Sequence, residues 1–333
     1  MRLQLTFACG QYDRVIALQD GSISPEGIDL NFVPMLPTEL FRRQARHAEF
    51  DVAEFSLSTH AILADQGDRR LVGIPVFPSR RFRHSEFFVN TGAGIREPRD
   101  LIGKRMGVME YQQTAAIWMR ALLQHDYGVR PDQIEWYFGG YDKPENYTER
   151  VPIELPSGVH STTIASHQSL DQLLDQGEID ALMGPTAPPS FLRGSPSVAR
   201  LFPNHREAEI EFYRRTSIFP IMHMVVIKRE VYEKAPWVAE SLYKAFVAAK
   251  AEGRSRLRRS GHLYCSLPWL RVHLEETDAL LGGDPFVYGL EENRKLLETF
   301  VDYSLEQGMI GRALTVDELF APETHGSVDP RSP

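Results

Sequence analysis

The strongest constraint on the fold is that short apolar segments alternate with amphipathic ones through most of the chain. Strands are predicted at residues 3–8, 28–33, 51–55, 71–77, 105–109, 134–138 and 179–184. Helices are predicted between them at residues 12–19, 38–47, 59–64, 114–125 and 168–176. After a second long apolar run at residues 218–227, helices are predicted at residues 238–252, 269–281 and 291–307. This order is typical of an α/β protein with mainly parallel strands.

Length and composition indicate an ordinary globular protein with two domains. The 333 residues are many for a single core, and 42% hydrophobic with 25% charged residues is normal for globular proteins. A net charge of −8 argues against nucleic acid as a partner, because phosphates need a basic face. No stretch has the length of a membrane span, so we expect no membrane partner. Residues 1–10 lack the apolar core of an export signal, and we therefore expect a cytoplasmic protein.

Sequence motifs for metals and cofactors are missing. Cys9 and Cys265 are too few and too far apart for a disulfide framework or a metal-ligand spacing. The 11 histidines are scattered, so we expect no required metal, although ligands gathered from distant segments stay possible. Neither a GxGxxG motif nor a P-loop lysine accompanies Gly92 and Gly94, and no Gly-x-Ser-x-Gly is present. We therefore expect no cofactor and disfavour a hydrolase.

Three segments are harder to interpret. Residues 139–158 carry prolines, glycines and charges without a clear period, and no structure is assigned to them. Residues 322–333 are rich in Pro, Gly, Ser and charge, which indicates a mobile tail. The aromatic and apolar stretch at residues 264–270 fits either a subunit contact of a homo-oligomer or a buried core helix.

A compact basic cluster follows the apolar run at residues 71–77: Arg80, Arg81, Arg83 and His84. Guanidinium groups match carboxylates with paired donors and stay charged in a cleft, which predicts a site for a small acid with more than one carboxylate. If the segment is extended, Arg81 and Arg83 share one side, and Arg80 lies with His84 on the other. The alternative is a loop of solvated surface charge.

Further polar residues follow other predicted strands. In open α/β sheets, ligands bind beyond the carboxyl ends of the strands. Candidates for substrate binding or catalysis there are Tyr12, Glu54, Ser56, Glu110, Gln113, Thr114 and Thr186. Gln113 and Thr114 open a helix, whose free N–H groups favour an anion. The alternative for Thr114 is a simple helix cap.

Four segments carry a resemblance to a known family: residues 78–84 (PSRRFRH), 100–108 (DLIGKRMGV), 111–115 (YQQTA) and 219–223 (FPIMH). The chain resembles the 4,5-dihydroxyphthalate decarboxylase family over nearly its whole length. That resemblance implies the two-lobed fold of type 2 periplasmic binding proteins, in which each lobe is a mixed sheet flanked by helices and the ligand cleft lies between the lobes. The expected lobes are residues 1–90 with 219–333, and residues 91–218.

The resemblance also implies a reaction. A carboxy-lyase of this family converts 4,5-dihydroxyphthalate, or a close relative, to 3,4-dihydroxybenzoate and CO2 in phthalate degradation, without a cofactor. The partner is then a small aromatic carboxylate. A general acid protonates the ring carbon that bears the carboxylate, and His84 and His223 are the candidates because histidine titrates near neutrality. Glu54 or Glu110 is expected to accept the phenolic proton.

Two other functions fit the same sequence. A non-enzymatic solute-binding protein of this fold uses the same arginines to hold an acid, but the missing export signal argues against transport. An enzyme of this fold acting on another carboxylated ring also remains possible. For either histidine, the alternative is a satisfied core or rim residue.

Overall fold

The computed structural model describes residues 2–259 and 261–330, and the chain divides into two compact units. Unit 1 contains the chain up to Arg80, Ile221–Thr299 and the chain from Leu314 onward. Unit 2 contains Arg81–Pro220 and Phe300–Ala313. Residues 81–90, 219–220 and 300–313, which we had expected in the first lobe, are thus grouped with unit 2.

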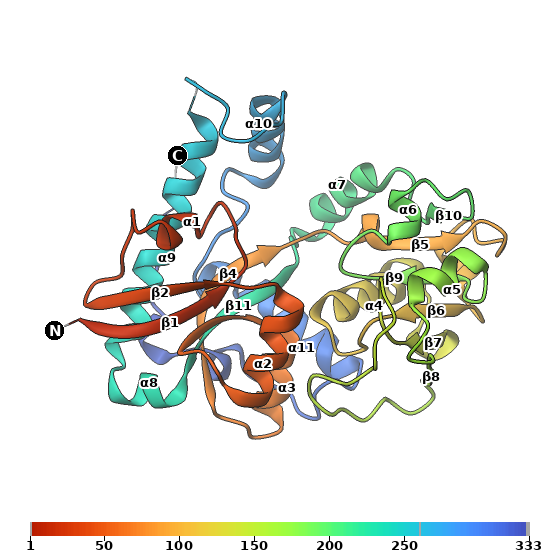
Figure 1. The fold of residues 1–333 in the computed structure, drawn as a ribbon, viewed down its shortest axis with the longest axis horizontal. Coiled ribbons are helices and arrows are strands. Elements are labelled where there is room, and N and C mark those ends of the chain that lie inside the picture. Colours follow the sequence, from red (N-terminus) through yellow and green to blue (C-terminus); the bar gives the residue numbers. More distant parts are fainter. Residues whose placement is uncertain (1, 260, 331–333) are drawn as a thin grey trace. The chain divides into compact units, whose positions relative to one another are not determined.

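Unit 1 is built on a five-stranded mixed sheet with the strand order β2-β1-β3-β11-β4 (Figure 1). Its strands are β1 (Leu3–Cys9), β2 (Ile28–Pro34), β3 (Val52–Ser56), β4 (Leu71–Arg80) and β11 (Ile221–Lys228). Strands β1, β2 and β3 are parallel, and β11 runs antiparallel to both β3 and β4. The carboxyl ends of β1, β3 and β4 and the amino end of β11 therefore lie at one edge of the sheet.

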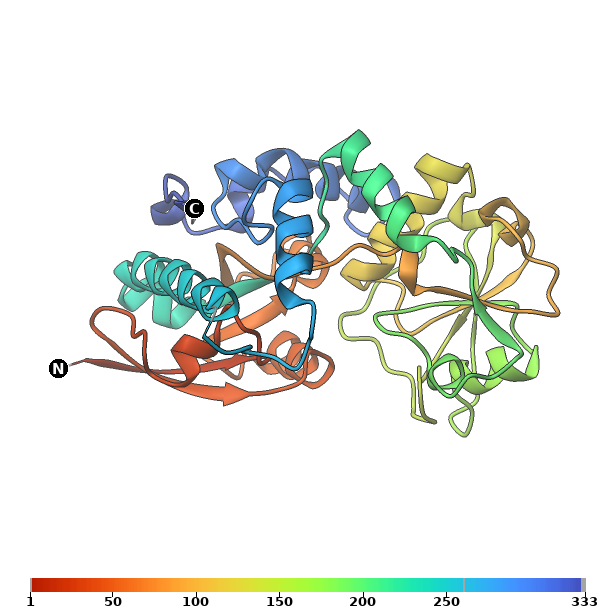
Figure 2. The same ribbon diagram turned by 90° about the horizontal axis from the view of Figure 1, so that it is seen from above.

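Helices pack against this sheet because its central strands are buried on both faces. All five residues of β3 are buried, as expected for a strand packed on both sides. Helices α2 and α3 pack against β3, and α9 packs against β4 and α1 (Figure 2). The helices of unit 1 are α1 (Ile16–Gln19), α2 (Pro37–His47), α3 (Leu57–Asp65), α8 (Arg229–Lys234), α9 (Trp237–Arg258), α10 (Leu270–Leu281) and the first part of α11 (Arg294–Glu306).

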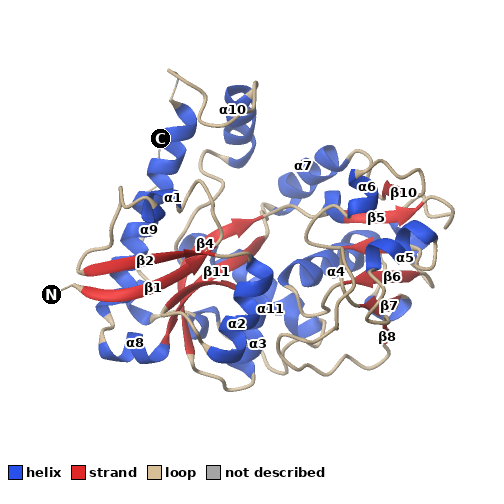
Figure 3. Ribbon diagram, in the orientation of Figure 1, coloured by secondary structure: helices blue, strands red, loops and turns tan. Residues whose placement is uncertain are grey.

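Unit 2 is built on a six-stranded mixed sheet with the order β10-β5-β9-β6-β7-β8 (Figure 3). Its strands are β5 (Phe87–Asn90), β6 (Arg105–Val108), β7 (Glu135–Phe138), β8 (His160–Thr163), β9 (Ala181–Met183) and β10 (Val198–Arg200). Strands β6 to β9 are parallel, whereas β5 runs antiparallel to β9 and to β10. Its helices are α4 (Thr114–Tyr127), α5 (Leu170–Gln176), α6 (Pro189–Leu192), α7 (His205–Thr216) and the end of α11.

Two elements of unit 2 have no apolar periodicity. Strand β8 has the sequence HSTT with all four residues exposed, and helix α7 has no buried residue. Residues 139–158, to which no structure was assigned, contain neither helix nor strand. Elements without a buried face leave no hydrophobic pattern in a sequence, which is why they were missed.

The segment expected to be a mobile tail is held by unit 1 over residues 322–330. Thr324 is buried in a short 3₁₀ helix (Pro322–Thr324). The buried carboxylate of Asp329 accepts hydrogen bonds from Lys250 Nζ of α9 and, at 2.6 Å, from the backbone N–H of Tyr288. The part of the expected tail at residues 331–333 lies outside the described residues.

A search of the helices within residues 2–259 and 261–330 finds none that combines the length and the apolar character needed to cross a lipid bilayer.

Candidate active site

Three sequence-predicted residues meet at the carboxyl edge of the unit 1 sheet: Tyr12, Glu54 and His223. Tyr12 follows β1, Glu54 lies near the end of β3, and His223 lies near the start of β11. Gly10 in the turn after β1 leaves room for Tyr12, because a Cβ there would lie 2.9 Å from its ring and would displace it. The sheet topology therefore brings together side chains from three separate parts of the sequence.

The Glu54 carboxylate is the centre of this cluster and has no exposed surface. Its Oε1 accepts hydrogen bonds from Tyr12 Oη at 2.7 Å and from His223 Nδ1 at 2.6 Å. Its Oε2 accepts from the backbone N–H of Gly10 at 2.8 Å and from Cys9 Sγ at 3.4 Å. Four donors thus satisfy a carboxylate that burial alone would make costly.

These contacts set the protonation states of the cluster. Burial raises the pKa of Glu54, but the charge and hydrogen bond of His223, with the donors Gly10 and Tyr12, outweigh it and leave this pKa below its ordinary value. Burial and the Glu54 charge raise the pKa of the Tyr12 phenol and of the Cys9 thiol. Glu54 is therefore an anion, and Tyr12 and Cys9 are neutral hydrogen-bond donors.

His223 is the member of the cluster that can exchange a proton with a ligand. Its Nδ1 is committed to Glu54, and its Nε2 makes no hydrogen bond to any residue that the structure describes. The side chain keeps 19% of its surface exposed, and the edge-to-face ring of Phe41, 4.7 Å away between centroids, supports it. A carboxylate on one imidazole nitrogen fixes which nitrogen is available for proton transfer.

Two other predicted residues of unit 1, Ser56 and Arg80, make hydrogen bonds within that unit. Ser56 caps helix α3 by accepting from the N–H of Thr59 and lies 3.1 Å from the hydroxyl of Ser58. Arg80 is buried and donates to the carbonyl of Val287 at 2.6 Å and to the side chain of Asn293. Arg80 is grouped with unit 1, whereas Arg81 and Arg83 are grouped with unit 2.

Arg81 and Arg83 lie at the carboxyl edge of the unit 2 sheet. Strand β4 ends at Arg80, so the extended backbone that we assumed for this segment stops before them, and a 3₁₀ helix starts at His84. Their guanidinium groups still converge, because the Nη1 atoms of both donate to the carbonyl of Pro185, at 3.1 and 3.4 Å. Arg81 is half exposed and also pairs with the buried carboxylate of Glu86.

Arg83 differs from Arg81 in being buried. Burial, together with the neighbouring charge of Arg81, lowers the pKa of Arg83 to about 9. Arg83 therefore still carries its charge at neutral pH. Both guanidinium groups therefore present donors at one carbonyl oxygen, and the Glu86 carboxylate partly offsets their charge.

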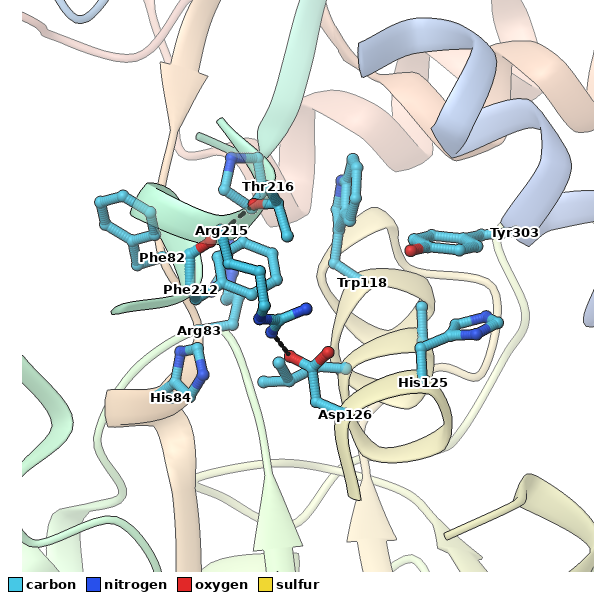
Figure 4. Close-up of a pocket in the computed structure, with 13 residues that line it drawn as sticks. Phe82, Arg83, His84, Trp118, His125, Asp126, Phe212, Arg215, Thr216 and Tyr303 are labelled. Carbon is cyan, nitrogen blue, oxygen red and sulfur yellow. Dashed lines mark hydrogen bonds and ion pairs between the residues drawn. The ribbon is translucent and has the colours of Figure 1, made fainter. Parts of the chain in front are cut away.

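His84 is buried like its neighbour Arg83, with 3% of its surface exposed. Burial lowers the pKa of His84 to about 4, so the ring is neutral at neutral pH. Its Nδ1 has no hydrogen-bond partner among the described residues. The ring lines a pocket inside unit 2, together with Arg83 and Phe212 (Figure 4).

The remaining predicted residues follow strands β6 and β9. Glu110 pairs with Arg150 at 2.8 Å, and both side chains are buried. Gln113, not Thr114, occupies the N-cap position of α4, and its amide contacts Met109 Sδ at 3.3 Å. Thr186 accepts a hydrogen bond from Tyr141 at its backbone carbonyl.

Sequence reasoning missed three contributors to these clusters. Gly10 and Cys9 donate to Glu54, and the only sequence signal for them was their place directly after β1. Arg14 stacks on the ring of Tyr12 at 4.3 Å and donates to the carbonyl of Pro78. The signal for Arg14 was the same position beyond the end of β1, where we had considered only Tyr12.

In the described part of the chain, no three His, Cys, Asp or Glu side chains are grouped so that they could hold a metal ion.

No protein-family model matches this chain. Similar proteins are found among curated proteins and among solved structures. A 4,5-dihydroxyphthalate decarboxylase of Comamonas testosteroni is 39% identical over 321 residues, which cover 96% of this chain and 97% of that protein. A 4,5-dihydroxyphthalate decarboxylase of Pseudomonas putida is 37% identical over 216 residues, which cover 65% of this chain and 83% of that protein.

Solved structures support the fold. The periplasmic aliphatic sulphonate binding protein SsuA of Escherichia coli matches with a TM-score of 0.55 and 16% identity, over 98% of this chain and 99% of that one. The alkanesulfonate-binding protein SsuA of Xanthomonas axonopodis matches with a TM-score of 0.54 and 11% identity, over 95% and 97%. With the two mixed sheets, these matches confirm the predicted fold class, a two-lobed fold like that of periplasmic binding proteins.

Proposed function

Because the chain belongs to the 4,5-dihydroxyphthalate decarboxylase family, and is therefore a decarboxylase, we propose that it acts on 4,5-dihydroxyphthalate or a close relative. The products of that reaction are 3,4-dihydroxybenzoate and CO2. The observation that carries the mechanism is the pairing of His223 Nδ1 with the buried Glu54 carboxylate at 2.6 Å.

The proposed reaction needs one proton and no electron acceptor. His223, as an imidazolium, gives its Nε2 proton to the ring carbon that bears the carboxylate. The hydroxyl para to that carbon shares the positive charge that develops in the ring. The bond to the carboxylate then breaks, its electron pair restores the aromatic ring, and CO2 leaves. His223 regains a proton from solvent. Because the substrate hydroxyl supplies the stabilisation of charge, the reaction proceeds without a cofactor.

His223 fits the role of general acid better than His84. A general acid must be protonated near the pH at which it works. The pKa of His84, lowered to about 4 by burial, leaves that ring neutral at neutral pH. His223 has an anionic partner that stabilises the imidazolium, and its second nitrogen is available.

Glu54 is a positioning residue in this mechanism and not the acceptor of the phenolic proton. Its oxygens already accept four hydrogen bonds, and its lowered pKa makes it a weak base. It fixes the tautomer of His223 and compensates the charge of the imidazolium. Glu110 is likewise committed, to the buried Arg150.

Arg81 and Arg83 are proposed to bind the substrate carboxylates. Two ortho carboxylates carry two negative charges within one small group, and paired guanidinium groups match that charge. The shared contact of both Nη1 atoms with the Pro185 carbonyl supports this assignment.

The test is an assay of the purified full chain with 4,5-dihydroxyphthalate and with related hydroxylated diacids. Loss of substrate is followed by chromatography, together with formation of 3,4-dihydroxybenzoate and release of CO2. We expect activity that survives dialysis against a chelator. Absence of CO2 release from 4,5-dihydroxyphthalate and from every related diacid would refute the proposed substrate class. Loss of activity on chelation, restored by metal, would refute the cofactor-independent mechanism.

A further inference from the structure

Unit 2 contains a pocket of about 170 Å³ whose lining includes one proposed substrate residue, Arg83, but neither Arg81 nor the proposed proton donor. It lies between helices α4 and α7, and residues 82–84, Pro220 and Tyr303 complete its wall (Figure 4). All of its lining residues belong to unit 2. Neither Glu54 nor His223 takes part in it, so the pocket is separate from the proposed proton donor.

The walls of the pocket are largely aromatic. Trp118 projects from α4 and Phe212 from α7, on opposite sides of the pocket, and Phe82 and Tyr303 add two further rings (Figure 4). Apolar cavities of roughly 150 Å³ are known to hold a benzene molecule. The space and its lining therefore suit a single six-membered aromatic ring, which can stack or meet these rings edge to face.

The charged residues of the pocket favour a singly charged anion. Arg215 Nη2 pairs with Asp126 Oδ2 at 2.7 Å, so these two charges balance. Arg83 adds a buried cation, and its Nε has no hydrogen-bond partner among the described residues. The side chain of Arg215 is 55% exposed, so that a carboxylate can reach its guanidinium from solvent.

His84 supplies a polar atom that lacks a partner. The ring is 97% removed from solvent, lines the pocket and has an unsatisfied Nδ1. A buried polar atom left without a hydrogen bond costs free energy, and a ligand hydroxyl or water in the pocket would remove that cost. The pocket therefore offers both an anion site and a hydrogen-bonding site beside an aromatic slot.

We infer that this pocket is a second ligand site, which binds a single aromatic ring that carries one carboxylate. The ring lies between Trp118 and Phe212, and the carboxylate meets Arg215. This inference goes beyond the proposed reaction, in which Arg215, Trp118 and Phe212 have no part, and shares only Arg83 with it. A ring with two carboxylates is disfavoured, because the pocket has a net charge of one positive.

The test is a titration of the full chain with benzoate, followed by tryptophan fluorescence. Four tryptophans are present, and only Trp118 lines the pocket. We expect a saturable change of emission that disappears in Trp118→Phe. Arg215→Gln leaves Asp126 facing the carboxylate without its partner, which should weaken binding by at least about tenfold. Phe212→Leu, which removes one stacking ring, should also weaken it.

Arg214→Gln is the matched control, because Arg214 is the exposed neighbour of Arg215 on α7 and does not line the pocket. We expect its affinity for benzoate to equal that of the unmodified chain. Circular dichroism of each variant checks that the fold is intact. The inference fails if benzoate causes no Trp118-dependent change, or if the two arginine variants behave alike.

Arg81→Met distinguishes this site from the proposed substrate site. Arg81 does not line the pocket, so its loss should leave the benzoate titration unchanged. If Arg81→Met instead abolishes the Trp118 signal, benzoate binds at the substrate arginines. That result overturns the second site and leaves the proposed decarboxylation standing.

Discussion

His223 and Glu54 form a hydrogen bond of 2.6 Å although 169 positions separate them in the sequence. In the antiparallel pairing of β11 with β3, Val225 lies opposite Glu54, and His223 lies opposite Ser56. His223 and Glu54 are thus diagonal neighbours across the two strands, a spacing within reach of long side chains. The register of one strand pair therefore positions the proposed general acid.

Replacing His223 should remove most of the activity. His223→Gln keeps a polar side chain of similar size but has no titratable group, so we expect kcat to fall by roughly 10² to 10⁴. The same substitution at His160, which is exposed in β8, is the control and should leave kcat unchanged. Steady-state rates of CO2 release measure both. A His223→Gln enzyme of nearly normal kcat would rule out this histidine as the acid.

Glu54→Gln tests the positioning role. The amide preserves shape but removes the charge that stabilises the imidazolium, so we expect kcat to fall by roughly 10 to 100-fold. Because Glu54 is buried and is not proposed to touch substrate, KM should change much less than kcat. The readout is the separate measurement of kcat and KM. A rise in KM with kcat preserved would instead assign Glu54 to substrate binding.

Parts of the fold could be read directly from the sequence because burial leaves a pattern. The apolar runs at residues 71–77 and 218–227 correspond to β4 and β11. These two strands pair with each other, and β11 carries His223. Strand β8 and helix α7 have no buried face and could not be found this way. The fold class followed from the order of elements together with the family resemblance.

The candidate site was predictable residue by residue but not as a set. Tyr12, Glu54 and His223 were each singled out by position, yet their contact depends on strand order and register, which the sequence does not reveal. The contacts of each arginine could not be predicted either. Arg80 and Arg83 look alike in the sequence, but Arg80 bonds to Asn293 within unit 1, whereas Arg83 lies beside Arg81 in unit 2.

Arg81→Met should weaken binding of a dicarboxylate. The change removes one of the two cations at the Pro185 carbonyl, and we expect KM for 4,5-dihydroxyphthalate to rise by roughly tenfold or more. Arg130→Met is the control, since Arg130 is an exposed arginine of unit 2 that pairs with the exposed Asp132. An unchanged KM in Arg81→Met would end the assignment of Arg81 to the substrate carboxylates.

Lys250→Met should destabilise unit 1. Lys250 is buried on α9 and pairs with two buried carboxylates, Asp284 at 2.5 Å and Asp329. Removing the cation leaves both buried carboxylates without the charge of Lys250. We expect this loss to lower the free energy of unfolding by about 3–5 kcal/mol. Lys244→Met is the matched control, because Lys244 lies on the same helix in an exposed pair with Glu240. Urea-induced unfolding compares them, and equal midpoints would contradict the prediction.

Acidification should destabilise the fold through two buried histidines, one in each unit. Burial lowers the pKa of His60 in unit 1, and of His84 in unit 2, to about 4. Between pH 6.5 and 4 the unfolded chain binds protons at these rings and the folded chain does not, so stability falls as the pH falls through this range. From pH 7 to pH 5 each ring should lower the free energy of unfolding by about 2 kcal/mol.

His84→Phe removes one of these two contributions. Its free energy of unfolding should therefore fall less between pH 7 and pH 5 than that of the unmodified chain. His160→Phe, the same change at an exposed position, should leave the pH dependence as it is. Urea titrations at both pH values measure the difference, and identical slopes for His84→Phe and the unmodified chain would show that His84 does not resist protonation in the folded state.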